Sequence, residues 1–111
     1  MKPEEFTADL HKELERNLAY YKEIFYQTKL EDVIDDYWYK AIVFFRSLNP
    51  DQQEVLLEII KQVQIDTMAT MLGIIDGIAS LNKVFKDVSL IVDGEKINGD
   101  LLEYFLEQDN S

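Results

Sequence analysis

Apolar residues in the middle of the chain recur at helical spacing on more than one side of a single predicted helix. Asn49, Pro50 and Gln52 form its start signal, because they suit the N-cap, the first and the third helical positions. Three rows follow: Leu56, Ile60, Val63, Met71, Ile74 and Ile78; Val55, Ile59, Met68, Leu72 and Ile75; and the small residues Ala69, Gly73 and Gly77. Because a helix that is apolar on several sides must be covered by other elements, we expect residues 50–77 to form a long central helix. In an alternative, this helix bends at Gly77 and continues to about Val84.

The residues before the central helix predict two further helices. Residues 3–27 carry an apolar stripe at helical spacing, made of Leu10, Leu14, Leu18, Tyr21 and Phe25. Thr28 and Glu31 are spaced as a capping box, in which the threonine oxygen accepts an amide and the glutamate reaches back. We therefore expect a second helix over residues 29–48.

The residues after the central helix change to a β pattern. Two short apolar runs flank Asp93-Gly94, which is the strongest local signal for a hairpin, and we place that hairpin at residues 88–98. Asp100 and Glu103 then form a second capping box ahead of a short helix over residues 101–108.

Together these elements predict a mainly α fold in a single domain spanning residues 1–111. The predicted architecture is a three-helix antiparallel bundle around the long central helix, plus a C-terminal β-hairpin and a short helix. A chain of 111 residues is the size of one domain with one good core. The tail from Gln108 onward is expected to fray.

The charge of the chain restricts its partners. The formal net charge is −11, from 22 acidic and 11 basic residues, and residues 51–111 alone carry a net charge of −8. Such a chain repels phosphate backbones and anionic lipids, so we expect neither nucleic acid nor a membrane as its partner. It attracts a basic protein surface, although acidity also serves solubility alone. The absence of cysteine and of a signal-peptide pattern favours a cytoplasmic protein.

Residues suited to catalysis or metal binding are scarce. His11 is the only histidine, and we place it on the outer half of the first helix, without a partner for acid–base work. Asp32, Asp35 and Asp36 share one face of the predicted second helix and are weak candidates for binding a hard cation. Acids at a helix start are also favoured by the helix dipole, so we expect no metal and no cofactor.

Asp66 stands out because it lies in the most apolar part of the central helix. A buried carboxylate needs hydrogen bonds or a positively charged neighbour. We expect Asp66 to be buried and to anchor a neighbouring helix, with a pocket around it as the alternative.

Aromatic residues gather in the first half of the chain, where nine of the thirteen lie between Tyr20 and Phe45. Tyr37, Trp38 and Tyr39 are consecutive, so at least one of them points outward from a helix. Exposed tyrosine and tryptophan are enriched at protein interfaces, so these three are candidate interaction residues. Core filling and an apolar ligand pocket remain alternatives.

These observations favour a small acidic protein-interaction module. One form of it is an immunity- or antitoxin-like inhibitor of a basic partner protein. The alternatives are a homo-oligomeric domain, such as a homodimer, that uses the small-residue row or the hairpin edge, and a small-ligand or metal-dependent enzyme that uses the clustered carboxylates.

Overall fold

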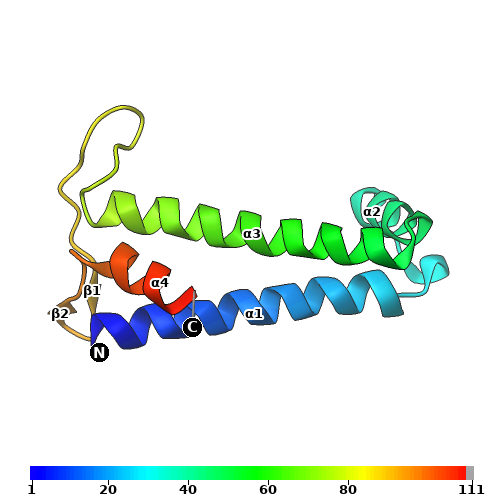
Figure 1. Ribbon diagram of the computed structural model, residues 1–111, viewed down its shortest axis with the longest axis horizontal. Coiled ribbons are helices and arrows are strands. Elements are labelled where there is room, and N and C mark those ends of the chain that lie inside the picture. The colour runs from blue at the N-terminus through cyan, green and yellow to red at the C-terminus, as the bar shows by residue number, and fades with distance from the viewer. Residues whose placement is uncertain (110–111) are drawn as a thin grey trace. The chain divides into compact units, whose positions relative to one another are not determined.

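The computed structural model describes residues 1–109 and is mainly helical. Its elements in chain order are α1 (Pro3–Gln27), a short 3₁₀ turn η1 (Leu30–Asp32), α2 (Asp36–Ser47), α3 (Pro50–Ile75), β1 (Ile91–Val92), β2 (Glu95–Lys96) and α4 (Leu101–Asp109) (Figure 1). The predicted mainly α class with one antiparallel hairpin is confirmed, and the three-helix bundle stays a prediction.

Internal contacts divide the chain into two compact units. Unit 1 consists of Met1–Leu14 and Gln64–Ser111, and unit 2 consists of Glu15–Val63. Each unit has its own hydrophobic core. The prediction of a single domain stays a prediction, because two cores in one chain do not establish two independently folding domains.

Unit 1 buries α4 against the first turns of α1 and the last turns of α3. Its core consists of Ile65, Leu72, Ile97, Leu101 and Phe105, with Phe6, Leu10 and Leu14 packed against it. The His11 Nε2 atom donates to the Phe105 carbonyl oxygen at 2.8 Å. Gln108, which was expected to fray, belongs to α4 and donates to the Glu4 carbonyl oxygen at 3.0 Å. Residues 110 and 111 of the predicted frayed tail lie outside the described residues.

Helix α3 begins and ends on the predicted signals. The Gln52 amide donates to Asn49 Oδ1 at 2.9 Å, and the Asn49 amide donates to Gln52 Oε1 at 3.0 Å, so the cap is reciprocal. The helix ends at Ile75, and Gly77 follows with a φ of +79°, a conformation that glycine adopts without strain. The alternative continuation to Val84 is wrong, because Leu81 and Val84 pair across a tight turn instead.

The predicted hairpin is present, with strands of two residues each. Ile91 pairs with Lys96, and Val92 pairs with Glu95. Asp93 and Gly94 both have positive φ, as the predicted Asp-Gly turn requires. Asn98 connects the hairpin to the end of α3. Its side chain accepts from the Leu90 amide and donates to two carbonyl oxygens, those of Ile75 and Val88.

Unit 2 has an aromatic core. Phe25, Ile42, Phe45 and Leu57 are buried, and Trp38 packs against them. The Phe25 and Phe45 rings stack with centroids 4.5 Å apart. Arg46 connects α2 to the end of α1, because its guanidinium donates to the Phe25 and Thr28 carbonyl oxygens.

The predicted start of the second helix is wrong. Residues 29–48 do not form one helix, because a 3₁₀ turn and an extended segment precede α2, which begins at Asp36. Leu30 and Val33 pack against the core of unit 2, and this folded connection places both side chains there. The N-cap is Asp35, whose Oδ1 atom accepts from the Trp38 amide at 3.0 Å.

Candidate protein-binding groove

The three predicted interaction residues separate in the structure. Tyr37 and Tyr39 are exposed, whereas Trp38 turns inward. The Trp38 ring lies 5.4 Å from the Tyr21 ring and 6.4 Å from the Phe25 ring, measured between centroids. Trp38 is therefore partly buried against the core of unit 2, and its two neighbours are the more exposed residues of the three.

An apolar groove opens between α2 and α3 in unit 2, where Figure 1 shows α2 beside the beginning of α3. Its volume is about 350 Å³. The lining residues are Phe44 from α2, Leu48 directly after it, and Asp51, Gln52, Val55, Leu56 and Ile59 from α3. We call this surface the α2–α3 groove.

The groove forms because each of the two helices carries exposed apolar side chains in addition to those that face the core. Phe45 is fully buried, so its neighbour Phe44 points to the outside and is 57% exposed. On α3, Leu57 is buried, and Val55 and Ile59 are each 53% exposed. Apolar side chains that are half exposed over adjacent helices form a surface typical of binding sites.

Tyr37 extends this apolar surface along α2. It lies seven residues before Phe44, which is about two turns on the same side of a helix. Its side chain is 64% exposed. One of the predicted interaction residues is thus on the same row of α2 as the groove.

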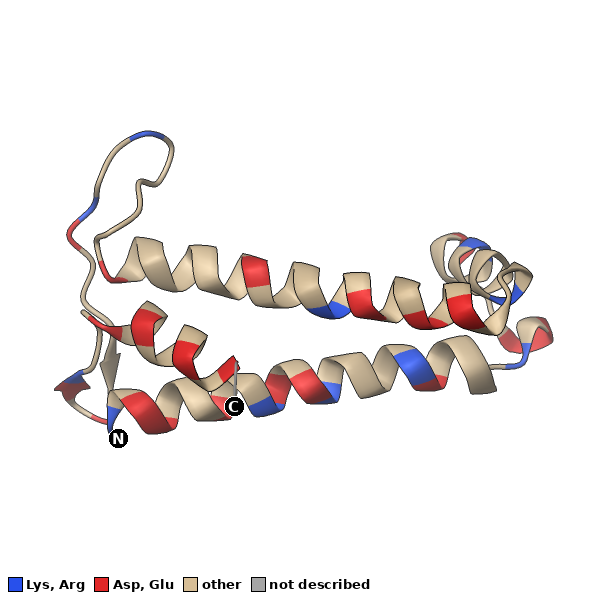
Figure 2. Cartoon of the chain, viewed as in Figure 1, with Lys and Arg blue, Asp and Glu red and all other residues tan. Residues whose placement is uncertain are grey.

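Acidic residues follow one side of the groove. Asp51, Glu54 and Glu58 are spaced three and four residues apart, so they form a row along α3. Figure 2 shows acidic bands along the first turns of α3. Asp51 lines the groove, whereas Glu54 and Glu58 continue its row and line a neighbouring hollow together with Lys22 and Lys61.

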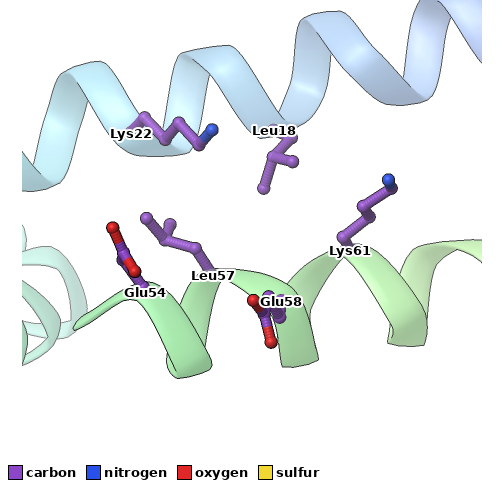
Figure 3. A pocket seen from close by; sticks show the side chains of 6 residues that line it. All are labelled: Leu18, Lys22, Glu54, Leu57, Glu58 and Lys61. Carbon is purple, nitrogen blue, oxygen red and sulfur yellow. The ribbon is translucent and has the colours of Figure 1, made fainter. Parts of the chain in front are cut away.

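A second hollow in unit 2 has mixed charge. It has a volume of about 330 Å³ and is lined by Leu18, Lys22, Glu54, Leu57, Glu58 and Lys61. Figure 3 shows that Lys22 on α1 and Lys61 on α3 flank the two leucines. Two positive and two negative side chains leave this hollow without a net charge to select a ligand, so the α2–α3 groove is the stronger candidate.

The prediction that Asp66 is buried is wrong, because Asp66 is exposed. Its carbonyl oxygen accepts from the Thr70 hydroxyl at 3.0 Å. The anchoring role expected of Asp66 belongs to Asp76, whose carboxylate accepts from the Gly99 amide at 2.7 Å and from the Leu102 amide at 2.8 Å. Asp76, rather than the predicted Asp100, therefore supplies a side-chain acceptor for the first turn of α4.

The three weak metal candidates do not come together on one helix. Asp32 ends the 3₁₀ turn, Asp35 caps α2, and Asp36 is its first residue. The expected spacing on one helical face is lost, since the chain is extended between Asp32 and Asp36. Across residues 1–109, no group of three or more histidine, cysteine, aspartate or glutamate side chains is placed to hold a metal ion.

The prediction that His11 lies on the outer half of the first helix is wrong. Its ring is half-buried and stacks on Phe105 with centroids 4.0 Å apart. Since a carbonyl oxygen only accepts, the bond to Phe105 requires a proton on Nε2. His11 therefore joins α1 to α4.

The expectation that α3 is covered on all sides is also wrong. Val55, Ile59 and Val63 in unit 2 are exposed, as is Met71 in unit 1. In the small-residue row, Gly73 packs closely against other residues of the same chain, because a Cβ atom there would lie 3.4 Å from Ala79 and from Leu102. The groove was not predicted from the sequence, because every side of α3 was expected to be covered. The α3 positions that form it nevertheless belong to the first two apolar rows.

Comparisons with protein-family models, curated protein sequences and solved structures find no match for this chain. Among the helices in the described part of the chain, none combines the length and the apolar character needed to cross a bilayer.

Proposed function

We propose that this chain is a small acidic protein-interaction module that binds a basic partner protein through the α2–α3 groove. The observation that carries the proposal is the groove itself, in which Phe44, Val55 and Ile59 are half exposed on adjacent helices. Apolar anchors at the centre of a surface supply most of the affinity of protein complexes. An immunity- or antitoxin-like inhibitor is one form of this function, and the cysteine-free chain suits the cytoplasm.

Charge supports a basic partner. The chain has a net charge of −11, so a basic protein approaches it faster than a neutral or acidic one. Of the acidic row, Asp51 lines the groove, and Glu54 and Glu58 lie in the neighbouring hollow together with Lys22 and Lys61. Binding is therefore expected to weaken as salt rises, because the Debye length falls from about 10 Å at 0.1 M to about 3 Å at 1 M.

The test is capture of the partner from a lysate of the native host with three versions of the chain. The first is the wild type, and the second is V55Q/I59Q, which replaces two groove residues with strong helix formers. The third is M71Q/I78Q, a control that changes two similarly exposed apolar residues of unit 1. We expect one near-stoichiometric basic protein with the wild type and the control, and its loss with V55Q/I59Q. Equal capture by all three versions would contradict the proposed site.

Homo-oligomerisation is a second candidate, and an exposed apolar loop in unit 1 favours it. Ile78, Leu81, Val84 and Phe85 are all at least half exposed. This loop contains Lys83 and Lys86, and Figure 2 shows basic bands on it. Sedimentation over a range of concentrations tests this candidate, and a monomer at every concentration would exclude it.

A further inference from the structure

The shape of the α2–α3 groove restricts the backbone of whatever binds it. Both walls are α-helices, whose interior backbone groups pair within each helix, and at the start of α3 the Gln52 and Gln53 amides donate to Asn49. The floor offers mainly aliphatic and aromatic carbon, from Phe44, Leu48 and Val55 among others. An extended peptide laid there would leave its own amides and carbonyls without partners, which is costly in an apolar site. A helix pairs these groups internally, so a helix is the favoured occupant.

The length of the groove sets the length of the occupant. Its lining on α3 runs from Asp51 to Ile59, a span of about 12 Å at 1.5 Å per residue. That span matches about two turns of a partner helix, whose apolar side chains recur at i, i+3 or i+4, and i+7. Val63 is exposed one turn beyond Ile59 and lengthens the apolar strip.

The edges of the groove differ in charge. Asp51, Glu54 and Glu58 follow one side of the apolar strip on α3. Phe44 on α2 and Leu48 directly after it line the groove opposite α3. A partner helix with an apolar stripe and basic residues along one flank matches this asymmetry. A second copy of this chain fits less well, because two chains of net charge −11 repel each other.

From this geometry we infer that the α2–α3 groove recognises a basic amphipathic helix of the partner protein, at least two turns long. The inference rests on the proposed function and specifies its partner. Apolar side chains of the helix occupy the groove, and lysine or arginine side chains on one flank meet Asp51, Glu54 and Glu58. The apolar anchors provide affinity, and the acidic row selects the orientation and speeds encounter.

The probes are two synthetic peptides of about fourteen residues with identical composition. One places leucines at helical spacing with lysines along one flank, and the other scrambles the order so that the leucines share no face. Fluorescence anisotropy gives the Kd of each peptide. We expect the amphipathic peptide to bind wild type at least about tenfold more tightly than the scrambled one, and V55Q/I59Q to abolish this preference.

Matched charge variants separate the acidic row from total charge. D51N/E54Q/E58Q and D93N/E103Q/E107Q each remove three negative charges, the first variant beside the groove and the second in unit 1. At low salt we expect the first variant to weaken binding of the amphipathic peptide about tenfold and the second about twofold or less, because screening limits distant charges. Circular dichroism checks that every variant keeps its helical content.

Equal binding of the two peptides to wild type, or equal losses in the two charge variants, would overturn the inference. If the captured partner depends on Val55 and Ile59 while neither peptide binds, the inference fails and the proposed function stands. If capture is insensitive to V55Q/I59Q, the proposed function itself fails.

Discussion

In unit 1, polar side chains bind the backbone of segments far apart in the sequence, whereas unit 2 relies on aromatic packing and local caps. Asn98 makes three hydrogen bonds to the backbone, and Asp76 accepts two amides near the start of α4. In unit 2, Phe25 and Phe45 stack, and the caps at Asp35 and Asn49 act within a few residues. Arg46 and Gln53 reach further, because Arg46 donates to the Phe25 carbonyl oxygen at the end of α1 and Gln53 donates to the Phe45 carbonyl oxygen eight residues away.

This difference shows how one chain supports both a stable scaffold and an open surface. The hairpin and α4 of unit 1 are short elements with little apolar area of their own, so directional bonds fix them in place. The helices of unit 2 already bury Ile42 and Phe45 completely. Their remaining apolar side chains are therefore available to a partner without loss of the core.

Truncation of a core ring is expected to have the largest effect. Phe45 in unit 2 and Phe105 in unit 1 are both fully buried, and replacing either by alanine should destabilise the fold by about 3–5 kcal/mol. Because α1 and α3 contribute to both units, we expect one urea transition for each variant. A two-step transition, with one unit surviving the loss of the other, would show that the units fold independently.

Asn98 is expected to matter more than Asn49, although both make side-chain hydrogen bonds to the backbone. Asn98→Ala leaves the Leu90 amide and two carbonyl oxygens without their partner and should cost about 2–3 kcal/mol. Asn49→Ala removes only an exposed helix cap, for about 1 kcal/mol. Urea denaturation measures both values, and equal losses would remove the contrast between the units.

Asp76→Asn should have an intermediate effect. One oxygen of the new side chain still accepts an amide, but its NH₂ group faces the other amide, at Gly99 or Leu102. We expect a loss of about 1–2 kcal/mol in thermal or urea unfolding. Glu107→Gln, at an exposed position of α4, is the control and should change stability by less than about 0.5 kcal/mol.

The smallest effect concerns alkaline pH. The Glu4 carboxylate, followed by burial and the Asp100 carboxylate, raises the pKa of the Tyr104 hydroxyl above 10.0. A folded-state pKa above the unfolded one gives stability that is present below the unfolded pKa and is lost as pH rises through the folded pKa. Tyr104→Phe should therefore flatten the fall of stability above pH of about 10. An unchanged slope would show that Tyr104 does not contribute.

The sequence predicted the elements whose signals are local. The Asn49–Gln52 cap, the Asp93-Gly94 turn and the end of α3 near Gly77 depend on residues close together in the chain, and the structure confirms them. The start of α2 was predicted wrongly, because the spacing of Thr28 and Glu31 suits a capping box while Leu30 and Val33 pack inward.

Long-range contacts could not be predicted in the same way. Asp66 and Asp76 both lie on apolar stretches of the sequence, and only tertiary packing brings Asp76 to the Gly99 and Leu102 amides. The groove depends on which apolar row of α3 meets α2, and the rows themselves do not identify the uncovered one. Of the predicted interaction residues, Tyr37 and Tyr39 are exposed, whereas the partly buried Trp38 ring packs on Phe25.

The most direct test of the central claim, that recognition belongs to the α2–α3 groove of unit 2, is a residue-resolved NMR titration with the basic amphipathic peptide. The account predicts that amide signals of Phe44, Val55 and Ile59 shift as the peptide is added, while those of unit 1 stay in place. Shifts confined to the exposed loop of unit 1, or spread over acidic positions of both units, would contradict it.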